Sequence, residues 1–164
     1  MNRRDDDMNS NTLSDYIVIK KTTIFDVANV LTTYNKSSDD LKNKMMGAFP
    51  LTGKLGIFHF YLSTTPFNFL LPVRIKSFVA FSNNSVVGFA YLTKKFNKKE
   101  KILGIFVVDQ YQGQGTGKKL LENILKGENE VTLNVLNDNE NAIKLYRQFG
   151  FEIDNIVQTM KLKK

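Results

Sequence analysis

Residues 112–119 read QGQGTGKK, so that three glycines and two lysines lie within one short stretch. Glycine lets the backbone approach an anion without a Cβ in the way. Successive N–H groups at the start of a helix point toward such a ligand, and the helix dipole attracts its charge. The stretch therefore predicts a phosphate-binding turn, made by Gln112, Gly113, Gln114, Gly115, Thr116 and Gly117, with Lys118 and Lys119 adding long-range charge or merely solvating the helix.

Three phosphate-binding patterns compete for this stretch. The Walker loop requires glycine at position 112 and a hydroxyl at 119, where the chain has Gln112 and Lys119. The dinucleotide fingerprint requires its third glycine at position 118, which is Lys118. A third pattern, Gln/Arg-x-x-Gly-x-Gly/Ala between a strand and a helix, is matched in full by Gln112, Gly115 and Gly117. We therefore favour the third pattern.

The elements around this turn follow from apolar periodicity and turn residues. Asn83-Asn84 predicts the turn of a β-hairpin. Some of the expected strands are joined as hairpins and others are separated by helices. This order predicts an α/β (α+β) fold with a mixed sheet flanked by helices. We expect strands at 16–20, 74–81, 86–93, 101–108, 131–136, 151–154 and 156–162, and helices at 23–34, 39–46, 116–126 and 139–149.

Length and composition set the class of protein. The chain has 164 residues and no cysteine, which predicts a single domain at 16–164 after a flexible tail at 1–15, without disulfides or cysteine metal sites. The net charge of +7 favours an anionic partner, either nucleic acid or a polyphosphate cofactor. The uncharged stretch at 55–73 is interrupted by Pro66 and Pro72, so we expect a buried loop or short helix there and no membrane span. Residues 1–16 contain no apolar core, so we expect no signal peptide.

Two segments carry a resemblance to a known family. VVDQYQGQGTGKKLLENIL is similar to the acetyl-CoA-binding segment of GNAT-type N-acetyltransferases. LNVLNDNENAIKLYRQFGF resembles the second motif of that family, and the two segments lie in the family's order within residues 102–151, near a third of the chain. The resemblance implies a mostly antiparallel sheet, splayed at its middle and flanked by about four helices. The second motif is filled by Asn139, Ala142, Tyr146, Gly150 and Phe151.

The resemblance also implies an activity and a set of roles. The chain would be a cytoplasmic enzyme that moves acetyl from acetyl-CoA to a primary amine, with no metal, nucleic acid or membrane, and a homodimer is compatible with this. The backbone of Ile105, Phe106 and Val107 would hold the pantetheine arm, and the Val107 amide would serve as oxyanion donor. Tyr146 would protonate the leaving thiolate. Asn139 would cap its helix, contact the cofactor, or both.

The sequence offers no residue that we assign as the general base. Many relatives carry a glutamate in the strand before the second motif, where this chain has Asn134. We expect Glu100, Asp138 and Glu140 to be surface charges, and His59 to be a packing residue. Asp109 replaces the proline of many relatives, which either costs rigidity or solvates a turn.

We favour a small molecule as the acceptor, because the missing glutamate disfavours protein acetylation. Its pocket would be lined by Phe58, Phe60, Tyr61, Phe67 and Phe69, and it would then be partly apolar or aromatic. Three alternatives stay open: a protein N-terminal or lysine acetyltransferase, a catalytically inert CoA-binding module, and a nucleic-acid binder, for which no motif appears.

Overall fold

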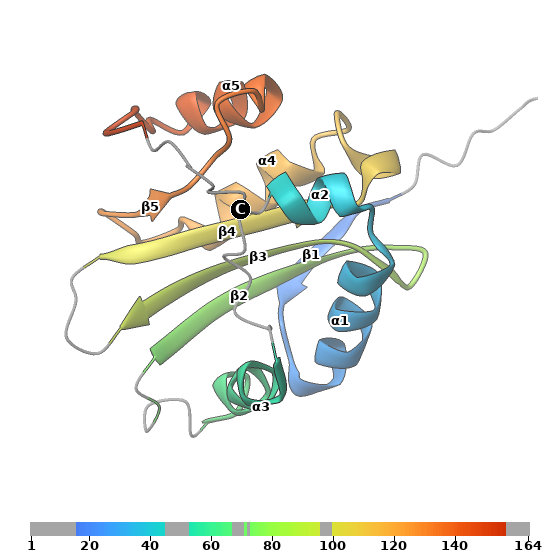
Figure 1. The fold of residues 1–164 in the computed structure, drawn as a ribbon. Helices are drawn as coiled ribbons and strands as arrows, with labels where there is room; N and C mark the ends of the chain where they lie inside the picture. The colour runs from blue at the N-terminus through green and yellow to red at the C-terminus, as the bar shows by residue number, and fades with distance from the viewer. Residues whose placement is uncertain (1–15, 45–52, 67–70, 72, 96–99, 157–164) are drawn as a thin grey trace, which may run out of the picture.

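The fold is a five-stranded sheet with helices on both faces (Figure 1). A computed structural model describes residues 16–44, 53–66, 71, 73–95 and 100–156, without the side chains of residues 43, 44, 53–56, 59 and 95. The strand order is β1-β2-β3-β4-β5, antiparallel up to β4 and parallel between β4 and β5. The expected mixed, mostly antiparallel sheet is thereby confirmed. The expected tail at 1–15 lies outside the described residues.

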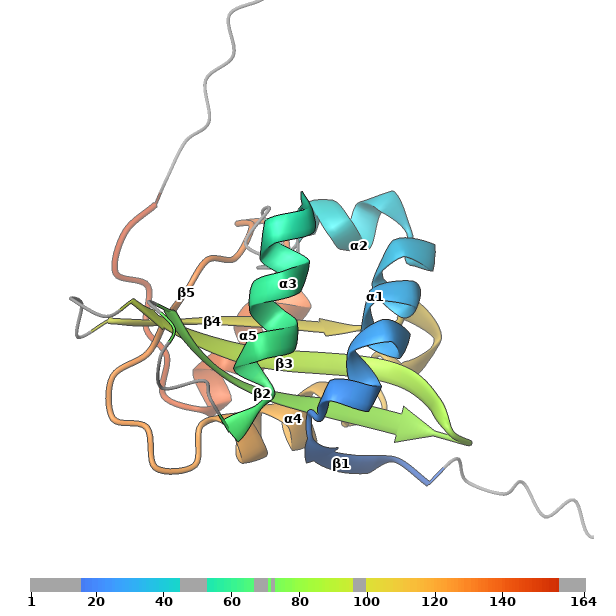
Figure 2. The ribbon, with the colours of Figure 1, turned by 90° about the horizontal axis from the view of Figure 1, so that it is seen from below.

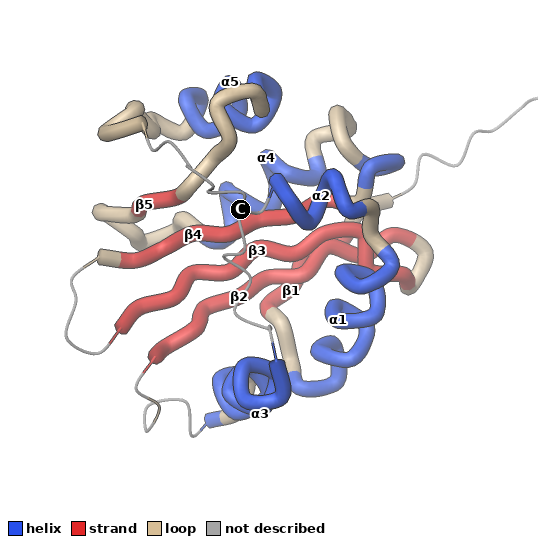
Figure 3. Tube along the Cα trace, viewed as in Figure 1, coloured by secondary structure: helices blue, strands red, loops and turns tan. Residues whose placement is uncertain are grey.

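The elements follow the expected order along the chain, as Figure 3 shows in helix and strand colours. The strands are β1 (Val18–Lys21), β2 (Val73–Ser82), β3 (Ser85–Lys95), β4 (Lys101–Val107) and β5 (Thr132–Leu133). The α-helices are α1 (Val27–Lys36), α2 (Asp39–Lys44), α3 (Gly53–Ser63), α4 (Thr116–Ile124) and α5 (Glu140–Gln148), and the short 3-10 helices are η1 (Ile24–Asp26) and η3 (Asp109–Tyr111).

Two apolar cores lie on opposite faces of the sheet. The helices α1, α2 and α3 cover one face, and α4 and α5 cover the other (Figure 2). The core on the α1 face contains Val27, Phe60, Phe89 and Phe106, each at most 2% exposed. The core on the α4 face is built around residues such as Leu120, which is completely buried. Alternate β4 side chains thus enter different cores, as expected for a strand covered on both faces.

The β2–β3 hairpin turns at the two predicted asparagines. Asn83 and Asn84 have φ angles of 47° and 61°, in the left-handed region that a two-residue hairpin turn of the mirror-image type requires. Asparagine tolerates this region better than most side chains. The hairpin prediction is confirmed.

The sheet opens between β4 and β5. These strands pair only at Ile102 with Thr132 and at Leu103 with Leu133, after which β5 ends and β4 continues to Val107. The expected strand at 131–136 is therefore reduced to two residues, because its remaining part leaves the sheet toward α5. This early end of the pairing is the predicted splay.

Three expectations, two after α5 and one in α3, need correction. Residues 151–154 form no strand, because only Phe151 packs inward, with its ring 5.8 Å from that of Tyr146, while Ile153 is 56% exposed. The strand expected at 156–162 is not formed at residue 156, and the rest of it lies outside the described residues. Phe60 is core rather than pocket lining.

The uncharged stretch at 55–73 begins as α3, in agreement with the short helix expected there. Phe58 is 59% exposed and Tyr61 is half-buried, whereas Phe67 and Phe69 lie outside the described residues. Among the described residues no helix has the length and apolarity needed to cross a membrane.

Glu128 ties three parts of the fold together. It follows α4, its side chain is only 11% exposed, and it accepts hydrogen bonds from Lys76 of β2, at 3.0 Å, and from Lys101 of β4. Burial opposes its charge, but the hydrogen bonds from Lys101 and Lys76 outweigh burial and lower the pKa of Glu128 below its ordinary value of 4.5. The charged pair fastens the α4–β5 connection to the sheet.

Replacing this carboxylate should weaken the fold in a pH-dependent way. Glu128→Gln is expected to lower the free energy of unfolding at pH 7 by about 2 kcal/mol, because charge-assisted hydrogen bonds are lost. Since folding lowers the pKa, the stabilisation by Glu128 is present at neutral pH and disappears as the pH falls below 4.5 and through the folded-state pKa. The two proteins should therefore converge in acid, as measured by urea unfolding at several pH values.

The matched control is Glu140→Gln. Glu140 pairs with Lys144 at 3.4 Å, but the two side chains are 74% and 68% exposed. An exposed pair contributes little. Equal losses for the two variants at pH 7 would contradict the role of Glu128.

Candidate active site

The glycine-rich turn lies between the end of β4 and the start of α4. Gly113 and Gly115 have φ angles of 72° and 80°, a conformation that favours glycine. A Cβ added at either position would meet no heavy atom within 4 Å. The two glycines therefore leave open space directly over the backbone of the turn.

The backbone N–H groups of this turn form no hydrogen bonds within the described part of the protein. In the described part of the chain, the N–H groups of residues 113–118 donate to no acceptor, and the first amide of the helix with a partner is that of Lys119, bonded to Gly115 O at 3.0 Å. A helix leaves its first amides without intrahelical partners. The turn adds further amides to these, so the site can receive an anion with several acceptor oxygens.

The polar side chains of the turn hold its shape. Gln112 Nε2 donates to Val107 O at 2.9 Å and to Asp109 Oδ1 at 3.0 Å, while its backbone N–H donates to Asp109 O at 3.1 Å. Gln114 Nε2 donates to Gln110 O at 2.7 Å, and the buried Thr116 donates its hydroxyl to Tyr111 O at 3.2 Å. The donors of Gln112 are thus used within the turn, which leaves ligand contact to the backbone amides.

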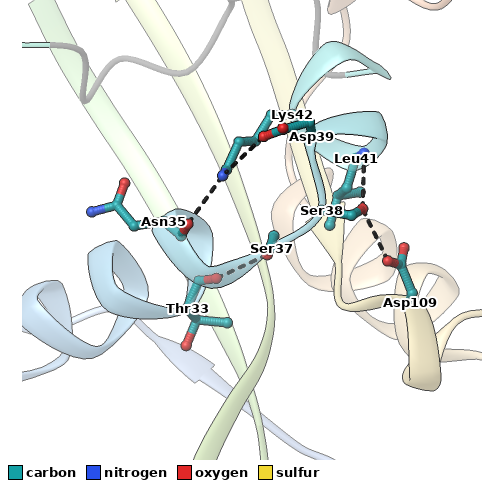
Figure 4. Close-up of polar contacts among 8 residues, drawn as sticks. All are labelled: Thr33, Asn35, Ser37, Ser38, Asp39, Leu41, Lys42 and Asp109. Carbon is teal, nitrogen blue, oxygen red and sulfur yellow. Dashed lines mark hydrogen bonds and ion pairs between the residues drawn. The ribbon is translucent and has the colours of Figure 1, made fainter.

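Asp109 connects the turn to the α1–α2 junction (Figure 4). Its Oδ2 accepts a hydrogen bond from Ser38 Oγ at 3.0 Å, while Oδ1 holds Gln112. Ser38 Oγ also accepts from Leu41 N at 3.2 Å at the start of α2. Asp109 therefore does more than solvate a turn. Ser38 and Asp109 are 71 positions apart, so no local pattern in the sequence signals this contact.

The end of β4 presents backbone groups to the opening of the sheet. Alternate residues of an antiparallel strand bond to the neighbouring strand. Val108 N donates to Val87 O of β3 at 2.9 Å. The Val107 carbonyl instead accepts a hydrogen bond from Gln112, on the side of β4 away from β3. By this alternation Ile105 and Val107 face the opening, where β5 no longer pairs, and the backbone of Phe106 faces β3.

Tyr146 reaches the α4 face of the opening from α5. It packs with Ile105 and Val107 around the same core. Burial raises the pKa of Tyr146 to about 12, so its hydroxyl stays protonated at neutral pH. Among the described residues no acceptor takes a hydrogen bond from this hydroxyl.

The position of α5 depends on Asn139 and Gly117. Asn139 is the N-cap of α5, and its side chain accepts from Ala142 N at 3.3 Å. A Cβ on Gly117 would lie 3.1 Å from Leu145 Cδ2, so this glycine allows α5 to pack closely on α4. Gly117 therefore serves helix packing as well as the turn.

The groups considered as bases do not gather at this site. Asn134, Glu100, Asp138 and Glu140 are exposed, and Glu100 accepts a hydrogen bond from Thr132 Oγ1 at 2.9 Å. The side chain of His59 on α3 lies outside the described residues. Within the described residues no group of His, Cys, Asp or Glu side chains could hold a metal ion.

Known proteins share parts of this sequence. The chain is 34% identical over 55 residues to the spermine/spermidine N(1)-acetyltransferase of Bacillus subtilis (strain 168), a match that covers 30% of this chain and 36% of that protein. The chain spans only part of the curated relatives that it matches, 21% of the length of one and 36% of the length of the other.

Solved structures share the fold over most of the chain. The acetyltransferase of the GNAT family from Streptococcus pneumoniae has a TM-score of 0.65 at 20% identity, over 85% of this chain and 87% of that one. The PaiA N-acetyltransferase of Thermoplasma acidophilum, solved with coenzyme A, has a TM-score of 0.57 at 20% identity, over 87% of this chain and 93% of that one.

The central region of the chain matches a family model. Residues 74–153 match the family model of the acetyltransferase (GNAT) domain. This region contains the β2–β3 hairpin, the glycine-rich turn and α5. This match identifies residues 74–153 as a GNAT acetyltransferase domain, and the solved structures show that the fold is shared over most of the chain.

Proposed function

We propose that this protein is an acetyl-CoA-dependent N-acetyltransferase that acetylates the primary amine of a small molecule. One observation carries the proposal: a turn whose amides have no acceptor among the described residues adjoins an opening edged by the backbone of Ile105 and the Val107 amide, which do not pair with β5. A diphosphate fits the first feature, and an amide-containing pantetheine arm fits the second. The Thermoplasma relative was solved with coenzyme A, which supports the same donor.

Different residues bind different parts of the donor in this proposal. The amides of residues 113–118 hold the diphosphate, braced by the side chains of Gln112, Gln114 and Thr116. The backbone of Ile105 and Val107 pairs with the pantetheine arm, with the Val107 amide as oxyanion donor. Phe106 contributes by shaping the strand, because its own backbone faces β3. Asn139 contributes by capping α5, which carries Tyr146.

Tyr146 supplies the proton for the leaving group. When the amine nitrogen attacks the thioester carbonyl, the carbon–sulfur bond breaks, and the departing sulfur takes the hydroxyl proton of Tyr146. The proton lost by the attacking nitrogen restores the phenol, so that charge balances over the cycle. A phenol with a pKa near 12 is a weak acid. It can still donate its proton here, because the proton from the amine returns to it and no stable phenolate forms.

The acceptor is a small molecule in this proposal. Asn134 is exposed, and its amide cannot act as a base. The Bacillus relative is named for spermine and spermidine, which makes polyamines necessary members of any acceptor panel. The panel should also contain peptides with a free N-terminus or lysine, to test protein acetylation. Binding of acetyl-CoA without thiol release for any acceptor would indicate an inert binding module.

A paired glycine substitution tests the turn. Gly115→Ala is expected to weaken CoA binding about tenfold, because the added methyl group fills the space over the amides and strains a residue with φ of 80°. Isothermal titration with CoA measures the effect. The matched control is Gly127→Ala, since Gly127 has φ of 78° and equally open surroundings but follows α4. Equal CoA affinity for the two variants would argue against the turn.

A conservative change tests Tyr146. Tyr146→Phe keeps the ring contact with Phe151 and removes the hydroxyl, so kcat should fall about a hundredfold while the CoA dissociation constant stays unchanged. Thiol release during acetyl-CoA turnover gives kcat. A variant as active as the wild type would remove Tyr146 as the proton donor.

The pH dependence tests the absence of a base. Because burial keeps Tyr146 protonated up to a pKa of about 12, log kcat/KM should rise by one unit per pH unit from pH 6 toward the pKa of the acceptor amine, which is about 10 for an alkylamine. The rise reflects only the fraction of free amine. A plateau that begins near pH 7 would instead require an enzyme base.

A further inference from the structure

The carboxylate of Asp109 joins two segments that lie far apart in the chain. Its Oδ2 accepts a hydrogen bond from Ser38 Oγ at 3.0 Å, and its Oδ1 accepts one from Gln112 Nε2 at 3.0 Å. Ser38 precedes α2, where its Oγ also accepts from Leu41 N at 3.2 Å, as Figure 4 shows. Gln112 is the first residue of the glycine-rich turn. One side chain therefore holds both the start of α2 and the start of the turn.

Asp109 also fixes the orientation of the Gln112 amide. The nitrogen of a primary amide carries two hydrogens, and Gln112 Nε2 donates both to Asp109 Oδ1 and to Val107 O, the latter at 2.9 Å. A carboxylate accepts hydrogen bonds and donates none, so it receives only the nitrogen end of the amide. Asp109 thereby holds Gln112 against the last residue of β4, whose own N–H is the oxyanion donor in the proposed function.

Packing between the α1–α2 junction and η3 is incomplete. A cavity of about 280 Å³ lies here, with Ser37 at the end of α1 and Gln110 of η3 among the residues that line it. Ser37 and Gln110 are the chain neighbours of Ser38 and Asp109. Unfilled space provides fewer contacts that could hold two segments together. The hydrogen bond between Ser38 and Asp109 therefore carries more of this connection than it would in a filled interface.

We propose that Asp109 is a positioning residue that couples the α1–α2 junction to the binding of acetyl-CoA. This inference rests on the proposed function. With Ser38 on one oxygen and Gln112 on the other, Asp109 holds the turn and the carbonyl of Val107 in the arrangement that receives the donor. A movement of α2 that breaks the bond from Ser38 loosens the same turn. The affinity for the donor thus depends on the position of α2.

Two substitutions of Asp109 separate its hydrogen bonds from its charge, which by itself opposes an anionic donor. Asp109→Asn and Asp109→Ala both remove the charge, but only the asparagine variant can still accept from Gln112 and bond to Ser38. The alanine variant should bind CoA about tenfold more weakly than the asparagine variant, because it lacks both hydrogen bonds. Isothermal titration with CoA measures the difference, and equal affinities overturn the proposal.

Glu100 provides a matched control before the start of β4. Its carboxylate accepts a hydrogen bond from Thr132 Oγ1 at 2.9 Å, and this contact is exposed. Glu100→Gln and Glu100→Ala remove charge and contact in the same way, away from the turn, so the two variants should bind CoA equally. A difference between them as large as that between the two Asp109 variants would overturn the assignment to Asp109.

A substitution of Ser38 tests the coupling to α2. Aspartate is also a good helix cap, so Ser38→Asp keeps an acceptor for Leu41 N but places a second carboxylate against Asp109. The affinity for CoA should fall about fivefold in the otherwise wild-type protein and by no more than about twofold when Asp109→Asn is also present, because the new amide can donate to the new carboxylate. Direct repulsion between position 38 and CoA acts equally in both proteins. Equal losses therefore overturn the coupling.

Hydrogen exchange at the start of α2 measures the same coupling in reverse. Two sites that are coupled affect each other by the same factor. Saturating CoA should slow the exchange of the Leu41 amide, which bonds to Ser38 Oγ, about fivefold in the wild type and by no more than about twofold in Asp109→Ala. A brace that acted only within the turn would leave this amide unaffected. Unchanged exchange in the wild type overturns the proposal.

The proposed function fails separately from this inference. Wild-type protein that does not bind CoA overturns both. Wild-type protein that binds CoA and shows the coupling, but acetylates no amine, overturns the proposed activity and supports the role of Asp109, which concerns the donor alone. Turnover by the wild type with equal CoA affinities of Asp109→Asn and Asp109→Ala overturns only the inference.

Discussion

The early end of the pairing between β4 and β5 is the constraint on which the site depends. Buried backbone N–H and C=O groups need partners, and a strand normally finds them in its two neighbours. After Leu103, β4 has a partner on the β3 side only. On the other side, the Val107 carbonyl accepts a hydrogen bond from Gln112, and the backbone groups of Ile105 and the Val107 amide are left for a ligand or for water. Under the proposed function, the splayed sheet is a binding site made from main chain, for which side-chain identity matters little.

The turn after β4 extends the same principle. Positive φ angles at Gly113 and Gly115 direct the chain into α4 while leaving its amides without acceptors. The cost of exposing them is limited by the braces around them, in which Gln112 and Asp109 use side-chain oxygens and nitrogens to hold the turn. Asp109 also reaches Ser38, so the helices of the α1 face are linked to the turn on which the donor would bind. The glycine-rich turn and the α1–α2 junction therefore share one small set of hydrogen bonds.

Each face of the sheet brings a tyrosine close to β4. The α4 face brings Tyr146, held by the close packing of Leu145 on Gly117. The α1 face brings Tyr91 across Gly104. In each case a glycine is needed because a side chain from another element occupies the place of its Cβ. These two glycines serve close approach, whereas Gly113 and Gly115 serve backbone conformation.

Local patterns in the sequence were sufficient for the hairpin, for the helices at 116–126 and 139–149 within a few residues, and for a glycine-rich turn between a strand and a helix. Each of these depends on residues close together in the chain: Asn83-Asn84, the glycines of the turn, and the cap at Asn139. Only the tertiary structure decided how long β5 is, that 151–154 forms no strand, that Phe60 is core, and that Asp109 binds Ser38. It also decided that Tyr91 lies on Gly104. These features depend on which strand or side chain, distant in sequence, occupies the neighbouring space, and periodicity records the burial of a residue without recording its partner.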